Sequence, residues 1–238
     1  MIIPIVRVRF EQAVYGSFSF WNRGYSVLAR SAGCRPEWLA ELRSVCQRYG
    51  EPPSGAAEAD SLFALRLESG PWMIVGVHPR GHDDQDRPGA LAFHALFIGR
   101  WAYGWTGADP FAMAGALQRE WTPADQERIL PEGCWTIRRF DRPTSDSSLA
   151  TANADERLAP IVAALTQRRR VAVQSSEPID GLARDVWHAL PRRVRRRVSV
   201  ATWAFDNANH FDLVALPKLA GVALGHSDLI LSLEHAGR

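Results

Sequence analysis

The order of apolar and polar residues predicts two strands and a helix at the start of the chain. Residues 6–10 alternate between apolar and charged side chains, which is the period of a strand with one buried face. Residues 24–29 form a second apolar-rich segment of strand length. Within 38–49, apolar side chains recur at helical spacing after Pro36, a residue that suits a first helical turn. This pattern places Cys46 on the buried face of the helix.

The middle of the chain predicts a β-hairpin and a strand at the centre of a sheet. Apolar residues alternate over 63–67, and after a Ser-Gly-Pro turn the segment 72–77 is mostly apolar. Residues 78–89 are predicted to form a polar loop. From 90 to 98 every residue except His94 is apolar, which indicates a strand buried on both faces.

The pattern changes beyond residues 141–148 and predicts a different kind of sheet there. Helix starts are predicted at 109–110 and 122–125, the second with the pattern of a capping box. The polar segment 141–148 is the predicted boundary between two lobes, 1–140 and 149–238, which are expected to pack as one compact unit. Beyond it we predict helices at 158–165 and 178–186 and strands at 171–173, 198–203, 211–216 and 229–233.

Strands that alternate with helices favour a βαβ-like unit with a parallel pair of strands in the C-terminal part. The N-terminal part, with its hairpin and consecutive strands, favours antiparallel pairing. The predicted fold class is therefore α+β, with a mixed sheet that is mainly antiparallel at its N-terminal end.

Charge is nearly balanced over the whole chain, with a formal net charge of +2. Lys218 is the only lysine and is followed by leucine, so the Gly-Lys-Ser/Thr sequence of a phosphate-binding loop is absent. Arginine is concentrated between residues 161 and 205, which carry nine arginines against three acidic residues. Because the chain as a whole lacks a strong basic excess, nucleic acid is not the expected partner.

Cysteine usage and the N-terminal sequence predict a cytoplasmic protein. Cys34, Cys46 and Cys134 are odd in number and lack the paired spacing of a zinc site or a disulfide framework. The first apolar stretch contains Arg7 and Arg9, unlike a signal peptide, and no segment reaches the ~18 consecutive apolar residues of a membrane span. We expect no membrane association, and no cofactor is indicated.

The predicted loop 78–89 holds the densest set of potential metal ligands. The loop contains His78, His82, Asp83, Asp84 and Asp86, and His94 follows in the next strand. Carboxylates and imidazoles bind divalent ions and act as general acids and bases. A hydrolase or metal-dependent enzyme that uses these residues is therefore one alternative, although their spacing matches no established signature. A buried His94 with a hydrogen-bond partner would equally fit a structural role.

Two arginine runs, 168–170 and 192–197, form the most basic part of the chain. Each lies where a predicted helix gives way to a strand, and cations near a helix C-terminus are stabilised by its dipole. Arg195, Arg196 and Arg197 are also candidates for binding an acidic protein partner or, as a further alternative, nucleic acid.

An aromatic segment at 101–105 is a second candidate contact for a protein. Trp101, Tyr103 and Trp105 alternate with small residues in a pattern that is typical of a core or an interface. If these side chains are exposed, the segment suits a protein partner.

Four phrases, in this order and at this spacing, resemble the N-terminal module of bacterial GTPase-associated protein 1. They are QAVYGS at 12–17, GYSVLARSAG at 24–33, RPG at 87–89 leading to FHAL at 93–96, and LP at 190–191 leading to RVSVAT at 197–202. Two positions depart from the family pattern: Asp86 stands where Gly is expected, and Ala201 where Ser is expected.

The resemblance implies a non-enzymatic adaptor that works beside a GTPase or ATPase in a multi-component bacterial system, of the defence or conflict type. The family supplies no catalytic residues to carry over. The positions that we predict to bind a partner are therefore Tyr15, Arg87, His94, Arg195, Arg196 and Arg197.

Overall fold

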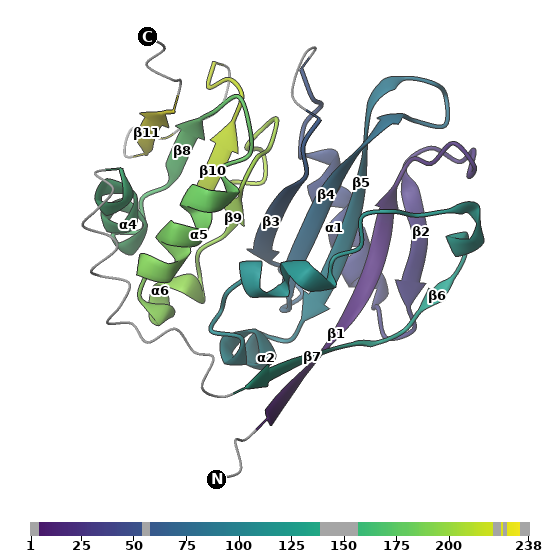
Figure 1. Ribbon diagram of the computed structural model, residues 1–238, viewed down its shortest axis with the longest axis horizontal. Helices are drawn as coiled ribbons and strands as arrows, with labels where there is room; N and C mark the ends of the chain where they lie inside the picture. The colour runs from purple at the N-terminus through teal and green to yellow at the C-terminus, as the bar shows by residue number, and fades with distance from the viewer. Residues whose placement is uncertain (1–4, 54–57, 139–156, 221–224, 226–227, 234–238) are drawn as a thin grey trace.

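One mixed sheet of eleven strands organises the chain (Figure 1). The computed structural model describes residues 5–53, 58–138, 157–220, 225 and 228–233. The strand order is β11-β8-β10-β9-β3-β4-β5-β1-β2-β6, and β7 pairs with β1 outside this path. Helices and a mixed sheet together confirm the predicted α+β class. The predicted boundary at 141–148 lies outside the described residues.

The N-terminal part of the sheet is mainly antiparallel, because consecutive strands return beside one another. β1 pairs with β2, β5 and β7, and β4 lies between β3 and β5, all in antiparallel register. Only β6 runs parallel to its neighbour, β2. The strands are β1 (Ile5–Gly16), β2 (Ser26–Ser31), β3 (Ser61–Arg66), β4 (Trp72–His82), β5 (Pro88–Ile98), β6 (Ile129–Leu130) and β7 (Gly133–Arg138).

The C-terminal part of the sheet is parallel. β10 pairs with both β8 and β9, and β11 pairs with the other edge of β8. The strands are β8 (Val171–Gln174), β9 (Val200–Ala201), β10 (Leu213–Leu216) and β11 (Leu229–Ser232). Parallel strands need crossover connections. Between β8 and β9 the crossover contains α5 (Asp180–Ala189) and α6 (Arg192–Arg195), and α4 (Leu158–Thr166) precedes β8.

Helices lie on both faces of the sheet (Figure 1). One face carries α4, α5 and α6 together with α2 (Arg100–Trp105) and the short 3₁₀ helices η1 (Phe111–Ala116) and η2 (Pro123–Asp125). The opposite face is covered by α1 (Pro36–Gln47), which buries Leu42, Val45 and Cys46 as its helical spacing predicts. Within the described ranges, no helix has both the length and the apolar character that a membrane crossing requires.

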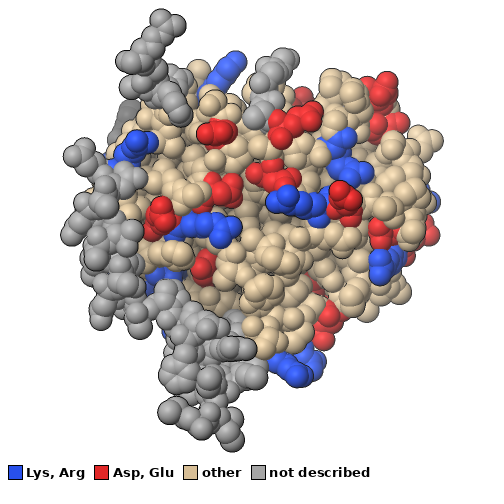
Figure 2. Space-filling model, viewed as in Figure 1, with Lys and Arg blue, Asp and Glu red and all other residues tan. Residues whose placement is uncertain are grey.

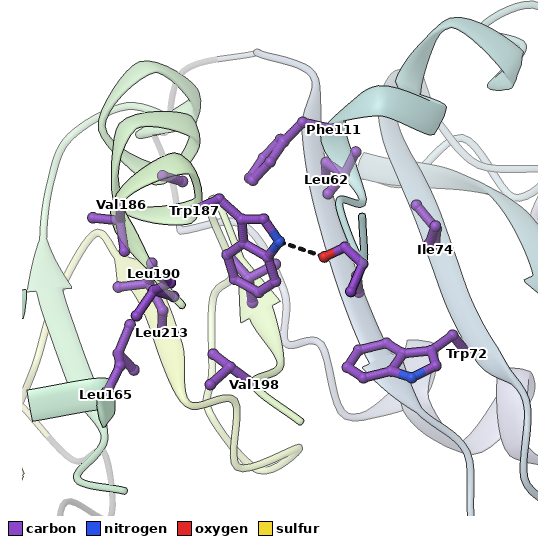
Figure 3. Packing of buried hydrophobic residues seen from close by; sticks show 14 of the residues in the cluster. Leu62, Trp72, Ile74, Phe111, Leu165, Val186, Trp187, Leu190, Val198 and Leu213 are labelled. Carbon is purple, nitrogen blue, oxygen red and sulfur yellow. Dashed lines mark hydrogen bonds between the residues drawn. The ribbon is translucent and has the colours of Figure 1, made fainter. Parts of the chain in front are cut away.

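The two parts of the sheet join where β3 meets β9. Phe63 and Ala64 of β3 pair with Ala201 and Val200 of β9 in antiparallel register. A single buried cluster extends across this joint, from Leu62 and Ile74 on one side to Val186 and Leu213 on the other (Figure 3). The core on this face of the sheet is therefore continuous across the joint.

Trp187 of α5 is one of the largest buried side chains at this joint. Its indole Nε1 donates a hydrogen bond of 2.7 Å to the carbonyl oxygen of Ala108, and its ring meets Phe111 edge to face at 6.0 Å (Figure 3). The bond fixes Ala108, whose φ of 55° lies in the left-handed region that is unusual for alanine. Trp187 thus connects the C-terminal helices to the segment after α2.

Gly50 allows a second connection, behind the sheet. With a φ of 90°, it ends the turn after α1, and a Cβ at this position would lie 2.8 Å from the backbone nitrogen of Asp206. The carbonyl oxygen of Tyr49 accepts hydrogen bonds from the backbone N–H groups of Phe205 and Asp206. A larger residue at position 50 would separate these two segments.

Several boundaries differ from the sequence predictions. The predicted loop 78–89 is wrong, because β4 continues to His82 and β5 begins at Pro88. The two arms of this hairpin pair through irregular register at Gly81, which lets polar residues occupy a strand. The predicted strand 198–203 is reduced to the two residues of β9, and the predicted helices at 110 and 123 are 3₁₀ turns.

Candidate functional site

A hollow of about 450 Å³ lies between the C-terminal end of α1 and the start of β5. We call it the Tyr15 pocket. It brings together two of the predicted binding residues, Tyr15 and Arg87, which are far apart in sequence. Tyr25, Gln47, Leu91 and Phe93 also line it. Its volume is in the range of small-molecule sites.

The hydroxyl of Tyr15 is a buried polar group without a hydrogen bond among the described residues. The Gln47 side chain beside it favours ionisation, but burial outweighs this effect and raises the pKa of Tyr15 to about 12. The ring contacts Tyr25 at 5.9 Å and Phe93 at 6.1 Å between centroids. The hydroxyl itself is enclosed by the surrounding side chains.

Tyr25 contributes a second phenol to the same pocket. Its oxygen accepts a hydrogen bond of 3.0 Å from the backbone N–H of Leu91. Because this bond uses only a lone pair, the O–H of Tyr25 is still free to donate. Burial raises the pKa of Tyr25 as well, so both phenols are neutral donors at ordinary pH.

Arg87 stands at the rim and is held by Asp83. Its Nε donates to the Asp83 carboxylate at 2.7 Å, and the same carboxylate accepts the backbone N–H groups of Gln85 and Arg87. These bonds hold the pKa of Asp83 below its usual range. Asp83 is therefore a structural residue of its turn, with its lone pairs occupied.

Asp84 and Asp86, the other two acidic residues of the predicted metal-binding loop, have different structural roles. Asp84 accepts hydrogen bonds from the Ser17 hydroxyl at 2.8 Å and the Gly24 backbone N–H at 2.6 Å, and so ties the β1–β2 connection to this turn. Asp86 has a φ of 61°, the left-handed region in which Gly is favoured and Asp is tolerated. Among the described residues, no group of three potential ligands is arranged to hold a metal ion.

His94 lies on β5, on the face of the sheet opposite Phe93, and is buried. Its Nδ1 accepts the backbone N–H of Gln118 at 2.8 Å, which leaves its Nε2 to donate to the Gln12 side-chain oxygen at 3.0 Å. Burial, with a smaller contribution from His78, lowers the pKa of His94 to about 3. The structure therefore does not bring His94 to the Tyr15 pocket and gives it two structural partners.

His78, at the start of the predicted metal-binding loop, is a second buried histidine. Its Nδ1 lies 2.9 Å from the Asp60 carboxylate, which also pairs with Arg119 at 3.0 Å. Its Nε2 is buried against Gly76 and has no hydrogen bond within the described part of the chain. An enclosed Nε2 cannot reach a substrate, so the pair is structural. No local pattern links residues 60, 78 and 119.

The three predicted arginines take separate roles at helix ends. Arg195 is buried, and its guanidinium donates to the carbonyl oxygens of Leu190 at 2.8 Å and His188 at 2.7 Å, where α5 ends. Arg197 donates to the carbonyl oxygen of Thr166 at 3.1 Å, at the end of α4. Both satisfy carbonyls that a helix C-terminus leaves unpaired.

Arg196 instead lies across α2. A Cβ at Gly104 would be 3.2 Å from Nη2 of Arg196, so the absence of a side chain at Gly104 lets the guanidinium pack there. Arg192 donates to the carbonyl oxygen of Gly104 from the same side. Figure 1 shows α6 and α2 at the same end of the molecule, near the N-terminus.

Two tryptophans on α2 are the most exposed aromatic side chains described. Trp101 is 74% exposed and Trp105, one helical turn later, is 53% exposed, whereas Tyr103 is buried. The guanidinium of Arg100 lies 5.3 Å from the Trp101 ring centroid. We call Arg100, Trp101, Trp105 and Arg196 the α2 surface. The aromatic segment therefore has an exposed face, as a protein contact requires.

Charge elsewhere is mixed. On the face seen in Figure 2, acidic and basic side chains are interspersed and do not form one basic patch.

Comparison of the chain with protein-family models, with curated proteins and with solved structures finds no match. The functional argument therefore depends on the geometry of the Tyr15 pocket and the α2 surface.

Proposed function

We propose that this chain is a non-enzymatic interaction module that binds an acidic segment of a protein partner through the α2 surface. The observation that carries the proposal is the pair of exposed tryptophans, Trp101 and Trp105, on one helical turn. Large aromatic side chains are costly to leave in water and are enriched at the centres of protein interfaces.

Charge around the tryptophans supports an acidic partner. Arg196, the C-cap residue of α6, is exposed, and Arg100 precedes Trp101 on α2. Within the described residues, neither of these arginines forms an ion pair, whereas Arg9, Arg23 and several others do. Unpaired arginines beside exposed aromatic rings suit carboxylates that come from another molecule.

The class of partner follows from the resemblance to the N-terminal module of bacterial GTPase-associated protein 1. On that basis the partner is a GTPase or ATPase, and the module acts in the cytoplasm as an adaptor in a multi-component bacterial system. The α2 surface gives this adaptor a place to contact its partner.

The enzymatic alternative receives less support from the geometry. Asp83 and Asp84 use their carboxylates to hold the turns around them, and His94 is buried between Gln12 and Gln118. A general acid or base must instead reach a substrate. Three of the groups that this alternative required, Asp83, Asp84 and His94, are thus already engaged.

The experiment compares what the tagged protein and its variants recover from the native host. The test variant combines Trp101→Ala with Trp105→Ala. Ile129→Ala is the matched control, because Ile129 is also 74% exposed but lies on β6 and not on α2. A second pair of variants, Arg196→Glu and Arg66→Glu, compares charge reversal on the α2 surface with charge reversal on β3.

We expect wild-type protein and both controls to recover the same GTPase or ATPase, and the two α2-surface variants to lose it. Binding of the purified partner should weaken as salt rises, because the contact includes arginines. Recovery that is unchanged by the tryptophan variant, or of nucleic acid in place of a protein, would contradict the proposal. Circular dichroism of each variant checks that the fold is intact.

A further inference from the structure

A hollow of about 310 Å³ lies between the C-terminal end of α4 and the segment that follows α6. We call it the arginine hollow. The residues that line it are Leu165, Arg168, Arg169, Arg197, Val198 and Asp212. Three arginines from two segments of the chain therefore share this hollow with one carboxylate, which leaves two positive charges in excess.

The carboxylate of Asp212 is occupied by the turn before β9. Its Oδ2 accepts hydrogen bonds from the backbone N–H of Ser199 at 2.7 Å and from the Ser199 hydroxyl at 2.8 Å. Within the described part of the chain, no ion pair joins Asp212 to Arg168 or Arg197. Asp212 therefore holds its own turn and does not neutralise these two arginines directly.

Arg168 and Arg197 both keep guanidinium donors for another molecule. Arg197 is exposed and uses only Nη2, which donates to the carbonyl oxygen of Thr166 at 3.1 Å. This bond also covers a carbonyl at the end of α4 that would otherwise repel an anion. Arg168 is exposed, and its side chain makes no hydrogen bond or ion pair with the described residues. Each guanidinium can therefore present a fork of N–H donors to incoming oxygens.

The backbone at Arg168 supports a role for its side chain. Arg168 follows the C-cap of α4, and its φ of 63° lies in the left-handed region. Glycine is favoured at this position after a helix, because a Cβ is strained there. Glycine would meet the backbone requirement at a lower cost, so what arginine adds is the guanidinium that lines the hollow.

We propose that the arginine hollow binds a phosphate group, with Arg168 and Arg197 donating to its oxygens. A phosphate monoester carries a charge of about −1.5 to −2 at pH 7 and three strong acceptor oxygens, which suits forked donors with two positive charges in excess. None of the residues of the hollow belongs to the α2 surface, so this is a second binding activity. Inorganic phosphate and an organic phosphate monoester share the chemistry, and the probes distinguish them.

The test is a titration followed by NMR at the Nε–Hε resonances of Arg168 and Arg197. Phenyl phosphate and inorganic phosphate are the phosphate probes. Phenyl sulfate has nearly the same shape but a single negative charge, and a thymidine oligonucleotide without terminal phosphates offers only phosphodiesters. We expect both resonances to shift with a phosphate probe at lower concentration than with phenyl sulfate. The tighter phosphate probe shows whether the ligand is free phosphate or a monoester that also contacts Leu165 and Val198.

Two variants separate phosphate binding from folding and from net charge. Arg197→Gln is compared with Arg48→Gln, because Arg48 is also exposed and donates to a carbonyl oxygen at a helix end, that of Ser44, at 3.2 Å. Both variants lose one charge, but only Arg197→Gln should weaken binding of the tighter phosphate probe, by about tenfold. Arg168→Gly should weaken it by a similar factor, while the urea midpoint stays the same or rises because the strained backbone is relieved.

Four results would overturn the proposal. They are no shift with either phosphate probe, equal binding of phenyl sulfate and phenyl phosphate, unchanged affinity in Arg168→Gly, and equal losses in Arg197→Gln and Arg48→Gln. Tighter binding of the oligonucleotide than of both phosphate probes would also contradict it, because the hollow would then be part of a nucleic-acid surface.

Discussion

Replacing Trp187 with phenylalanine is expected to lower the free energy of unfolding by about 3 kcal/mol. The indole N–H donates to the Ala108 carbonyl oxygen at 2.7 Å, and Trp187 is fully buried. Phenylalanine leaves that oxygen buried without a donor, at a cost of about 1–3 kcal/mol. The smaller ring also removes apolar contact beside Phe111, which adds about 1 kcal/mol.

Urea unfolding followed by far-ultraviolet circular dichroism measures this change without using tryptophan fluorescence. The midpoint should fall while the slope with urea stays constant, because one cooperative unit still unfolds. Trp101→Phe is the matched control, since Trp101 is exposed, and should change stability by less than about 0.5 kcal/mol. A loss below about 1 kcal/mol for Trp187→Phe, or two separate transitions, would refute the role assigned to this side chain.

Two further predictions concern His94 and Arg195. Because the pKa of His94 is lowered to about 3 in the folded chain, the unfolded chain binds more protons below about pH 6.5, and stability should fall as pH decreases, by up to about 1.4 kcal/mol per unit. Urea titrations of wild-type protein and His94→Gln from pH 7 to pH 4 check this; a stability difference that is constant with pH would contradict it. Arg195→Ala should cost about 2–3 kcal/mol, because two carbonyls at the end of α5 lose a charged donor. The exposed Arg193→Ala should cost less than about 0.5 kcal/mol, and equal losses in the two variants would argue against a capping role.

Local periodicity was sufficient to predict the elements whose burial follows their own sequence. The helix that buries Val45 and Cys46 and the central strand around His94 are both observed, and the fold class is confirmed. In each of these segments the alternation or spacing of apolar residues matches the side that faces the core. A window of about ten residues was therefore enough to predict the type and the buried side of these elements.

A window of this length does not predict which distant segments pair with one another. β10 lies between β8 and β9, although it follows both in the chain, and nothing in 211–216 indicates that position. The extension of β4 to His82 was missed because its polar residues occupy an irregular hairpin. The two-residue length of β9 depends on its neighbours, not on its own apolar sequence.

The same reasoning applies to the candidate sites. Tyr15 and Arg87 were predicted separately, but their meeting in one pocket comes from the pairing of β1 with β5. The dipole argument correctly indicated a structural role for arginines near helix ends, as Arg195 and Arg197 show. The Asp60–His78 contact was not predicted, because no local sequence pattern relates the two residues.

The joint between β3 and β9 has a consequence for how the chain is made. β3 is complete by residue 66, but its partner β9 is not synthesised until residue 201. During translation, the edge of β3 therefore stays unpaired while more than half of the protein is still to be synthesised. An open edge pairs readily with foreign strands, so a delay in translation between these two points would favour aggregation before the sheet can close.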